Sequence, residues 1–198
     1  SEADVIIVIA RSTPRTDSHK SRGISAFIVT PDLPGFHVGK KENKMGLRAS
    51  PTVQLNLDGM RVPGANLLGQ EGQGFLYAMR SLDHGRLGIA AQAIGIARAA
   101  LEHSVDYAAQ RTQFGRPIRD FEAIQFKVAD MGARIASARA LLHATAAAKD
   151  RGESTTLYGS MSKLLASETA MYVTTEAVQI FGGYGYVKDY PVEKYFRD

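Results

Sequence analysis

The first third of the chain carries short apolar runs of the length typical of β-strands. The runs are Val5 to Ala10, Ile24 to Thr30, Phe36 to Gly39 and Val53 to Leu57, and Pro, Gly, Ser and Asp separate them. In the last run apolar and polar residues alternate, as expected of a strand with one buried face. The pattern predicts a small sheet, or part of a barrel, in this region.

After the glycine-rich stretch Gly69 to Gly74, the apolar positions recur with the period of a helix. Gly74 to Gln110, Asp120 to Arg151 and Ser154 to Phe181 are predicted as long amphipathic helices with short connections. The apolar stripes expected to face a core are Met79, Leu82, Ile89, Ala93 and Ile96 in the first helix; Ile124, Val128, Met131, Ile135, Ala138 and Leu142 in the second; and Leu157, Met161, Leu164, Met171 and Val178 in the third.

Together these patterns predict an α+β protein. Residues 1–70 are expected to form a partial β-barrel or β-sandwich domain, and residues 71–198 an incomplete antiparallel four-helix bundle. Three helices with apolar stripes need a fourth helix or a partner chain to close a bundle. The first strand begins at the N-terminus and the chain ends in a helix start, so both domains are expected to be truncated.

Composition excludes several classes of chemistry. The 198 residues include no cysteine, which rules out disulfides, thiolate metal sites and a cysteine nucleophile. The net charge is +4 without a block of five Lys or Arg, so nucleic acid is not an indicated partner. The sequence contains no apolar run of about 18 residues, the length that would predict a membrane span. The five histidines, His19, His37, His84, His103 and His143, are too scattered for a metal site.

Arg86 interrupts the apolar stripe of the first helix, where a charge is costly unless it is paired or meets an anion. Asp83 lies three residues earlier on the same face. The pair is therefore either an intrahelical ion pair or part of a polar ligand cleft.

The segment Arg111 to Gly115 permits two interpretations. It can be a helix C-terminus, where Arg favours the dipole and Gly caps the last turn. It can also be a site where Arg111 grips a phosphate and Phe114 packs on a ring.

The segment Gln179 to Tyr186 is likewise ambiguous. It can be a helix stop in which glycines adopt positive φ, or a place where a ligand approaches bare backbone beside the Gln179 amide. It follows a helix rather than a strand, which excludes a dinucleotide-binding βαβ unit.

Several motifs, collinear along the chain, strongly resemble those of the acyl-CoA dehydrogenase family. The motifs are Lys44 to Ser50, Val62-Pro63, Leu67 to Gly69, Leu82 to Arg86, Arg111 to Gly115, Gln179 to Gly183 and Tyr190 to Asp198. The similarity is greatest to short-chain and short/branched-chain members. It implies the C-terminal part of a middle β-domain followed by the C-terminal helical bundle, without the N-terminal helical domain.

The resemblance implies FAD as the cofactor, bound between the β-domain, the bundle and a neighbouring subunit's bundle. Arg111 and Gln113 would hold the pyrophosphate of the neighbour's FAD, and Phe114 would pack near its adenosine. The further implied contacts are Glu122, which stands where relatives often have Gln, and the segment Gln179, Ile180, Phe181, Gly182 and Gly183.

The same resemblance places Asp83, His84, Gly85 and Arg86 at an acyl-CoA cleft. Family members use a glutamate to abstract the α-proton. Gly85 occupies one position where a few relatives carry it, and the usual position follows Asp198, so no catalytic residue is expected within this chain and the chain alone is expected to be inactive.

The implied parent is an FAD-dependent acyl-CoA dehydrogenase of short or branched acyl-CoA. It would form a homotetramer, a dimer of dimers, and pass electrons to an electron-transferring flavoprotein. The implied location is the cytoplasm of a bacterium or the mitochondrial matrix of a eukaryote. Alternatives on the same scaffold are an acyl-CoA oxidase-like flavoenzyme and a noncatalytic relative that binds DNA or serves assembly.

Overall fold

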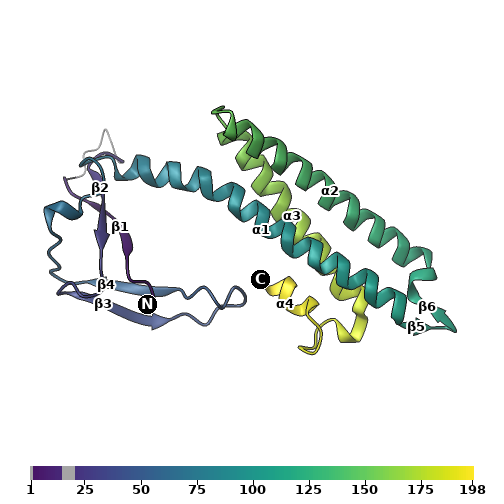
Figure 1. The fold of residues 1–198 in the computed structure, drawn as a ribbon. Helices are drawn as coiled ribbons and strands as arrows, with labels where there is room; N and C mark the ends of the chain where they lie inside the picture. Colours follow the sequence, from purple (N-terminus) through teal and green to yellow (C-terminus); the bar gives the residue numbers. More distant parts are fainter. Residues whose placement is uncertain (1, 15–20) are drawn as a thin grey trace. The chain divides into compact units, whose positions relative to one another are not determined.

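The computed structural model describes residues 2–14 and 21–198, and the chain divides into two compact units, residues 1–82 and 83–198. The first unit contains small antiparallel sheets and the second contains long helices (Figure 1). The predicted α+β class is confirmed at this level. Within the described residues the strands form separate two-stranded sheets and close no barrel.

Strand β2, Ile24–Val29, belongs to the first antiparallel pair of the first unit. It pairs antiparallel with β1, Ile6–Arg11, in a register that places Ile6 opposite Val29. Its buried side chains include Ala26 and Val29. A second antiparallel pair, β3 (Phe36–Lys41) and β4 (Val53–Leu57), has a bulge between Val38 and Lys41. Each strand lies within a few residues of its predicted span.

The glycine-rich stretch fastens the start of α1 to β2. The Gly72 N–H donates a hydrogen bond of 2.8 Å to the buried Ser25 hydroxyl. A Cβ atom at Gly74 would lie 2.4 Å from the carbonyl carbon of Ser25, so only glycine allows this close approach. The backbone of β2 therefore determines where helix α1 begins.

The long helices follow the predicted spans closely. Helix α1 is Gly74–Gln110, α2 is Glu122–Asp150 and α3 is Thr156–Phe181. A 3-10 turn, Gly182–Tyr184, follows α3, and the short helix α4 is Val192–Arg197. The connection from α2 to α3 is so short that the two helices run antiparallel side by side (Figure 1). The Thr145 and Ser162 hydroxyls join them through a buried hydrogen bond of 3.0 Å.

The core of the second unit uses small residues on two of its three long helices. Helix α1 contributes Ala90, Ala97, Ala100 and Ala108 with Ile94, and α3 contributes Ala166, Val173, Ala177, Ile180 and Phe181. Helix α2 buries Met131, Ile135 and Ala138, which belong to its predicted stripe. Small side chains allow neighbouring helices to approach closely, so this core depends on fit as much as on apolar area.

The stripes predicted to be buried in the first and third helices are wrong in part. Leu82 and Ile89 in α1 are 56% and 50% exposed. In α3 the stripe of Leu157, Met161, Leu164 and Met171 is between 46% and 68% exposed. The reason is that α3 is apolar on two opposite faces, and its small-residue face packs against α2. We call these four exposed residues of α3 the outer stripe.

Candidate functional site

Arg111 directly follows the last residue of α1, and backbone hydrogen bonds hold it on both sides. Its N–H donates to the Tyr107 carbonyl at 2.8 Å, which completes the last helical turn. Its carbonyl accepts from the Ile118 N–H, also at 2.8 Å, which closes the intervening hairpin. The side chain of Arg111 therefore projects from a defined position.

The hairpin between α1 and α2 consists of β5, Thr112–Gln113, and β6, Arg116–Pro117. Its two turn residues, Phe114 and Gly115, have φ values of 54° and 80°, as in the tight turns that favour Asn-Gly. Phe114 adopts this left-handed conformation, which is strained for a residue other than glycine. It is 94% exposed, so packing within the chain does not offset the strain. A strained, exposed aromatic residue is a feature that suggests a role in binding.

The end of α3 also requires glycine. Gly182 has φ 59° and ψ −130°, a region that only glycine adopts readily, and its N–H donates back to the carbonyls of Val178 and Gln179. The chain then turns through Gly183 and Tyr184. This turn lies beside the end of α1.

A cluster of aromatic rings connects the two helix ends. Tyr107 stacks on Phe181, whose ring meets the edge of Tyr190, and Tyr190 in turn contacts Tyr184 at 5.4 Å between ring centroids. Burial raises the pKa of the Tyr107 hydroxyl, and the nearby positive charge of Arg111 opposes that rise. Tyr107 is therefore protonated at neutral pH.

These elements form a pocket of about 450 Å³. Its lining is Tyr107, Arg111, Gln113, Ile118, Ile180, Phe181, Gly182, Gly183 and Tyr184. Within the described part of the chain, no carboxylate lies within 4.0 Å of the Arg111 guanidinium. An unpaired guanidinium beside exposed glycine backbone is suited to bind an anion, and the rings suit a flat partner next to it.

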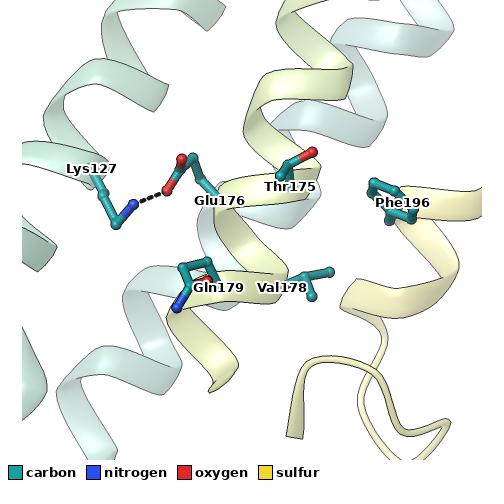
Figure 2. A pocket seen from close by; sticks show the side chains of 6 residues that line it. All are labelled: Lys127, Thr175, Glu176, Val178, Gln179 and Phe196. Atoms are coloured by element: carbon teal, nitrogen blue, oxygen red, sulfur yellow. Dashed lines mark hydrogen bonds and ion pairs between the residues drawn. The ribbon is translucent and has the colours of Figure 1, made fainter. Parts of the chain in front are cut away.

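Gln179 lines a different pocket, of about 520 Å³, on the neighbouring side of α3 (Figure 2). There Lys127 of α2 forms an ion pair with Glu176, and Thr175, Val178 and Phe196 complete the lining. The predicted cofactor residues are thus divided. Six line the pocket that contains Arg111, and Gln179 lines the other.

Two predicted cofactor residues line neither pocket. Phe114 lies at the hairpin tip, where its ring meets the edge of Phe121 at 6.2 Å. Glu122 is the first residue of α2 and is exposed. Its carboxylate is favourably placed at a helix N-terminus, which gives it a structural role independent of any ligand.

The predicted substrate residues Asp83 to Arg86 lie together near the other end of α1. Asp83 accepts a hydrogen bond of 2.5 Å from Arg86 and another of 3.2 Å from the Thr156 hydroxyl at the start of α3. His84 and Gly85 are exposed. The geometry contains the ion pair that one interpretation anticipated, and it adds a link to α3 that the sequence did not indicate.

The two predicted sets do not meet within one chain. Arg86 and Arg111 are separated by ~37 Å along α1, at 1.5 Å per residue. A single small ligand therefore cannot contact both sets in the same subunit.

Sequence reasoning did not assign three lining residues of the Arg111 pocket, Tyr107, Ile118 and Tyr184, to the cofactor site. Tyr107 precedes Arg111 by four residues, a spacing that places both on one helix face and could have revealed it. No comparable spacing relates Tyr184 to Arg111. Among residues 2–14 and 21–198, no group of three His, Asp or Glu side chains is arranged to hold a metal ion, and His19 lies outside the described residues. In the same residues, no helix is both long and apolar enough to cross a membrane.

Comparison with known proteins gives matches along the whole chain. Residues 72–198 match the model of the acyl-CoA dehydrogenase C-terminal domain, and residues 1–60 match that of the middle domain. An acyl-CoA dehydrogenase of Bacillus subtilis is 54% identical over 99% of this chain and 51% of its own length. The chain thus spans about half the length of the curated relatives it matches.

Two solved structures are similar in both fold and sequence. The butyryl-CoA dehydrogenase of Megasphaera elsdenii has a TM-score of 0.93 and 49% identity, covering 98% of this chain and 50% of its own. A chain from a structure of the electron transferring flavoprotein of Acidaminococcus fermentans has a TM-score of 0.94 and 49% identity, covering 99% of this chain and 51% of its own.

Proposed function

Since this chain belongs to the acyl-CoA dehydrogenase family, we propose that it is the flavin- and subunit-binding half of an FAD-dependent enzyme. The whole protein would dehydrogenate a short or branched acyl-CoA between its α and β carbons. When bound, FAD would accept the hydride that leaves the β-carbon. Gly85 carries no carboxylate, so the base that takes the α-proton belongs elsewhere in the protein.

The residues of the Arg111 pocket fit one half of this cofactor. The guanidinium has no carboxylate partner within the described residues, so its N–H groups suit the negatively charged pyrophosphate. Gln113 adds an amide, and Gly182 and Gly183 allow close approach to backbone. The exposed ring of Phe114 would pack near the adenosine. Gln179 of α3 and Glu122 at the start of α2 would contact the same adenosine and pyrophosphate half of FAD.

The separation between Arg86 and Arg111 is the observation that carries the proposal. Since ~37 Å divides the two sets, one FAD cannot lie beside the acyl-CoA residues and also reach Arg111 of the same chain. We therefore assign Arg111 and the Gln179 to Gly183 segment to the FAD of a neighbouring subunit. Asp83 to Arg86 would line the acyl-CoA cleft of their own subunit.

The same proposal accounts for the exposed apolar surfaces. Residues 1–70 would form part of a β-barrel or β-sandwich domain, in which further strands cover Val5, Ile7 and Ile9, each at least 46% exposed here. Residues 71–198 would form most of an antiparallel four-helix bundle in a homotetramer, a dimer of dimers. A fourth helix and neighbouring subunits would cover the outer stripe of α3.

We further propose acyl-CoA as the substrate and an electron-transferring flavoprotein as the electron acceptor. The similarity to butyryl-CoA dehydrogenase supports a short acyl chain, and the similarity to a chain from an electron transferring flavoprotein structure supports that partner. The compartment would be the bacterial cytoplasm or the mitochondrial matrix, according to the source.

Replacement of Arg111 in the whole protein tests the assignment. Arg111→Ala should lose most bound FAD and dissociate into smaller assemblies, because one contact serves both cofactor and neighbouring subunit. Arg116→Ala removes the same charge from the same hairpin, outside the pocket lining, and should retain both. Flavin absorbance and sedimentation measure the two properties. Normal FAD content in Arg111→Ala would refute the cofactor role.

A second measurement distinguishes a dehydrogenase from an oxidase. The flavin is first reduced anaerobically with a short acyl-CoA and is then exposed to oxygen. Slow reoxidation by oxygen, with fast reoxidation by an electron-transferring flavoprotein, is expected. Fast reoxidation by oxygen alone would favour the oxidase.

A further inference from the structure

The guanidinium of Arg111 lies over the ring of Tyr184, with 5.5 Å between its central carbon and the ring centroid. The face of an aromatic ring attracts a cation electrostatically, and one ring can meet only some of the five N–H donors of a guanidinium. This contact can therefore orient Arg111 without occupying the donors that an anion needs.

The ring of Tyr184 is itself held in place. Tyr184 ends the 3-10 turn that follows Gly182, and its ring contacts that of Tyr190 at 5.4 Å with a tilt of 50°. It remains 45% exposed, so one part of the ring supports Arg111 and another faces solvent. The ring of Tyr184 is therefore supported by the ring of Tyr190.

Arg134 is a second guanidinium over a tyrosine ring, and it differs from Arg111 by also having a carboxylate partner. Its guanidinium lies 4.0 Å from the centroid of the Tyr172 ring, but its Nε also donates to Asp130 at 3.1 Å. Asp130 occupies part of the donor edge of Arg134, and the charge is locally neutralised. Arg111 has the aromatic support without such a carboxylate within the described residues.

We propose that Tyr184 is a positioning residue for Arg111. Its ring would hold the guanidinium at the Arg111 pocket, where the N–H groups would donate to the pyrophosphate of bound FAD. This inference rests on the proposed cofactor role of Arg111, and it adds a residue outside the predicted cofactor set. Because the rotamers of a long side chain are restricted before binding, less conformational entropy is lost when the phosphate arrives.

The test measures affinity in the full-length apoprotein, with FAD and with ADP as separate probes. Tyr184→Leu should raise the Kd for both ligands about three-fold to ten-fold, as expected for a partly exposed cation–ring contact. Tyr184→Phe keeps the ring and should bind like the unchanged protein. Tyr186→Leu is the matched control, because Tyr186 lies two residues away and is 76% exposed outside the pocket lining.

A double-mutant cycle separates positioning from general loss of structure. In an Arg111→Gln background, Tyr184→Leu should change the Kd no further, because the group that it positions is absent. An equal effect in both backgrounds, or an equal loss in Tyr186→Leu, would overturn the positioning role. If Tyr184→Leu does not fold, Tyr184→Met removes the ring while keeping an apolar side chain, and the same outcomes apply.

The two proposals fail in different ways. An unchanged Kd in Arg111→Gln would refute the cofactor site itself. A weakened Arg111→Gln together with an unchanged Tyr184→Leu would refute the role of Tyr184 and leave the cofactor site standing.

Discussion

The ring of Tyr107 lies flat against the ring of Phe181, with centroids 4.0 Å apart and planes inclined by 14°. Tyr107 belongs to the last turn of α1 and Phe181 is the last residue of α3. The Tyr107 hydroxyl also donates to the Phe181 carbonyl at 3.4 Å, a long hydrogen bond. This pair joins the two helix ends that form the Arg111 pocket.

The first prediction concerns the stability that this pair supplies. Tyr107→Leu should lower the free energy of unfolding by about 1–3 kcal/mol, because it removes a stacked ring and leaves space beside Phe181. Tyr107→Phe should cost less than about 1 kcal/mol, since only the long hydrogen bond is lost. Chemical denaturation of both variants measures the difference. Equal losses would mean that the hydroxyl, rather than the ring, joins the helices.

The second prediction follows from the raised pKa of Tyr107, which has burial as its main cause. The folded chain retains the proton at a pH where the unfolded chain has lost it. The unfolding free energy should therefore be unaffected by this group below pH ~10 and should fall as the pH rises through the folded pKa. Thermal melts are recorded between pH ~8 and ~11, a range that spans the ordinary tyrosine pKa. The Tyr107→Phe variant should lose less stability at the alkaline end than the unchanged protein. Identical pH profiles would contradict the burial of this hydroxyl.

The sequence predicted the elements better than their partners. The span of α1 was confirmed at both ends, and α2 and α3 differ from expectation by about two residues. Glycine and proline mark where helices stop, and this information is local. The outer stripe of α3 was misassigned because a period shows that a face is apolar and does not show what covers it.

The site was predictable only where its chemistry is carried by a motif. Arg111, Gln113 and the Gly182-Gly183 pair were predicted as cofactor contacts, and the structure places them around one pocket. Gln179 belongs to the same motif but faces another pocket, because neighbouring residues on a helix point in different directions. Tyr184 acts through a contact across the chain, which no local pattern records.

The third prediction tests the glycine that fastens α1 to β2. Gly74→Ala should destabilise the first unit by about 1–3 kcal/mol, because the new Cβ would lie 2.4 Å from the backbone of Ser25. Gly88→Ala, in the same helix with no atom within 4 Å of the new Cβ, should be neutral or stabilising by up to about 1 kcal/mol. Urea denaturation of the pair measures both. A neutral Gly74→Ala would show that the α1 start can move away from β2.

The fourth prediction concerns the outer stripe. Leu164→Asp should lower the melting temperature or dissociate the assembly, because a buried, unpaired carboxylate is costly if a helix or subunit covers this face. Lys163→Asp introduces the same residue at an exposed position off the stripe and should have little effect. Sedimentation distinguishes the two coverings: a fourth helix of the same chain predicts lower stability without dissociation. An unchanged Leu164→Asp protein would show that the stripe faces solvent.

The last prediction addresses the Asp83–Arg86 pair, for which the sequence left two interpretations open. Both side chains are about one third exposed, at 36% and 37%, and an ion pair of this exposure contributes only about 0.5 kcal/mol to stability. If the pair is structural alone, Asp83→Asn should lower the melting temperature slightly and leave the kinetics of the whole enzyme unchanged. If Arg86 lines the acyl-CoA cleft, the same change should raise KM for acyl-CoA at least about ten-fold, because the guanidinium loses the carboxylate that orients it.

We expect the increase in KM. Thr156→Val provides the matched control, since it removes only the 3.2 Å hydrogen bond from α3 and leaves the 2.5 Å contact to Arg86 in place. Steady-state kinetics and thermal melts of both variants decide the question. A KM shift in Asp83→Asn that is absent from Thr156→Val would assign the pair to substrate binding, whereas matched losses of stability with unchanged KM would reduce it to a link between α1 and α3.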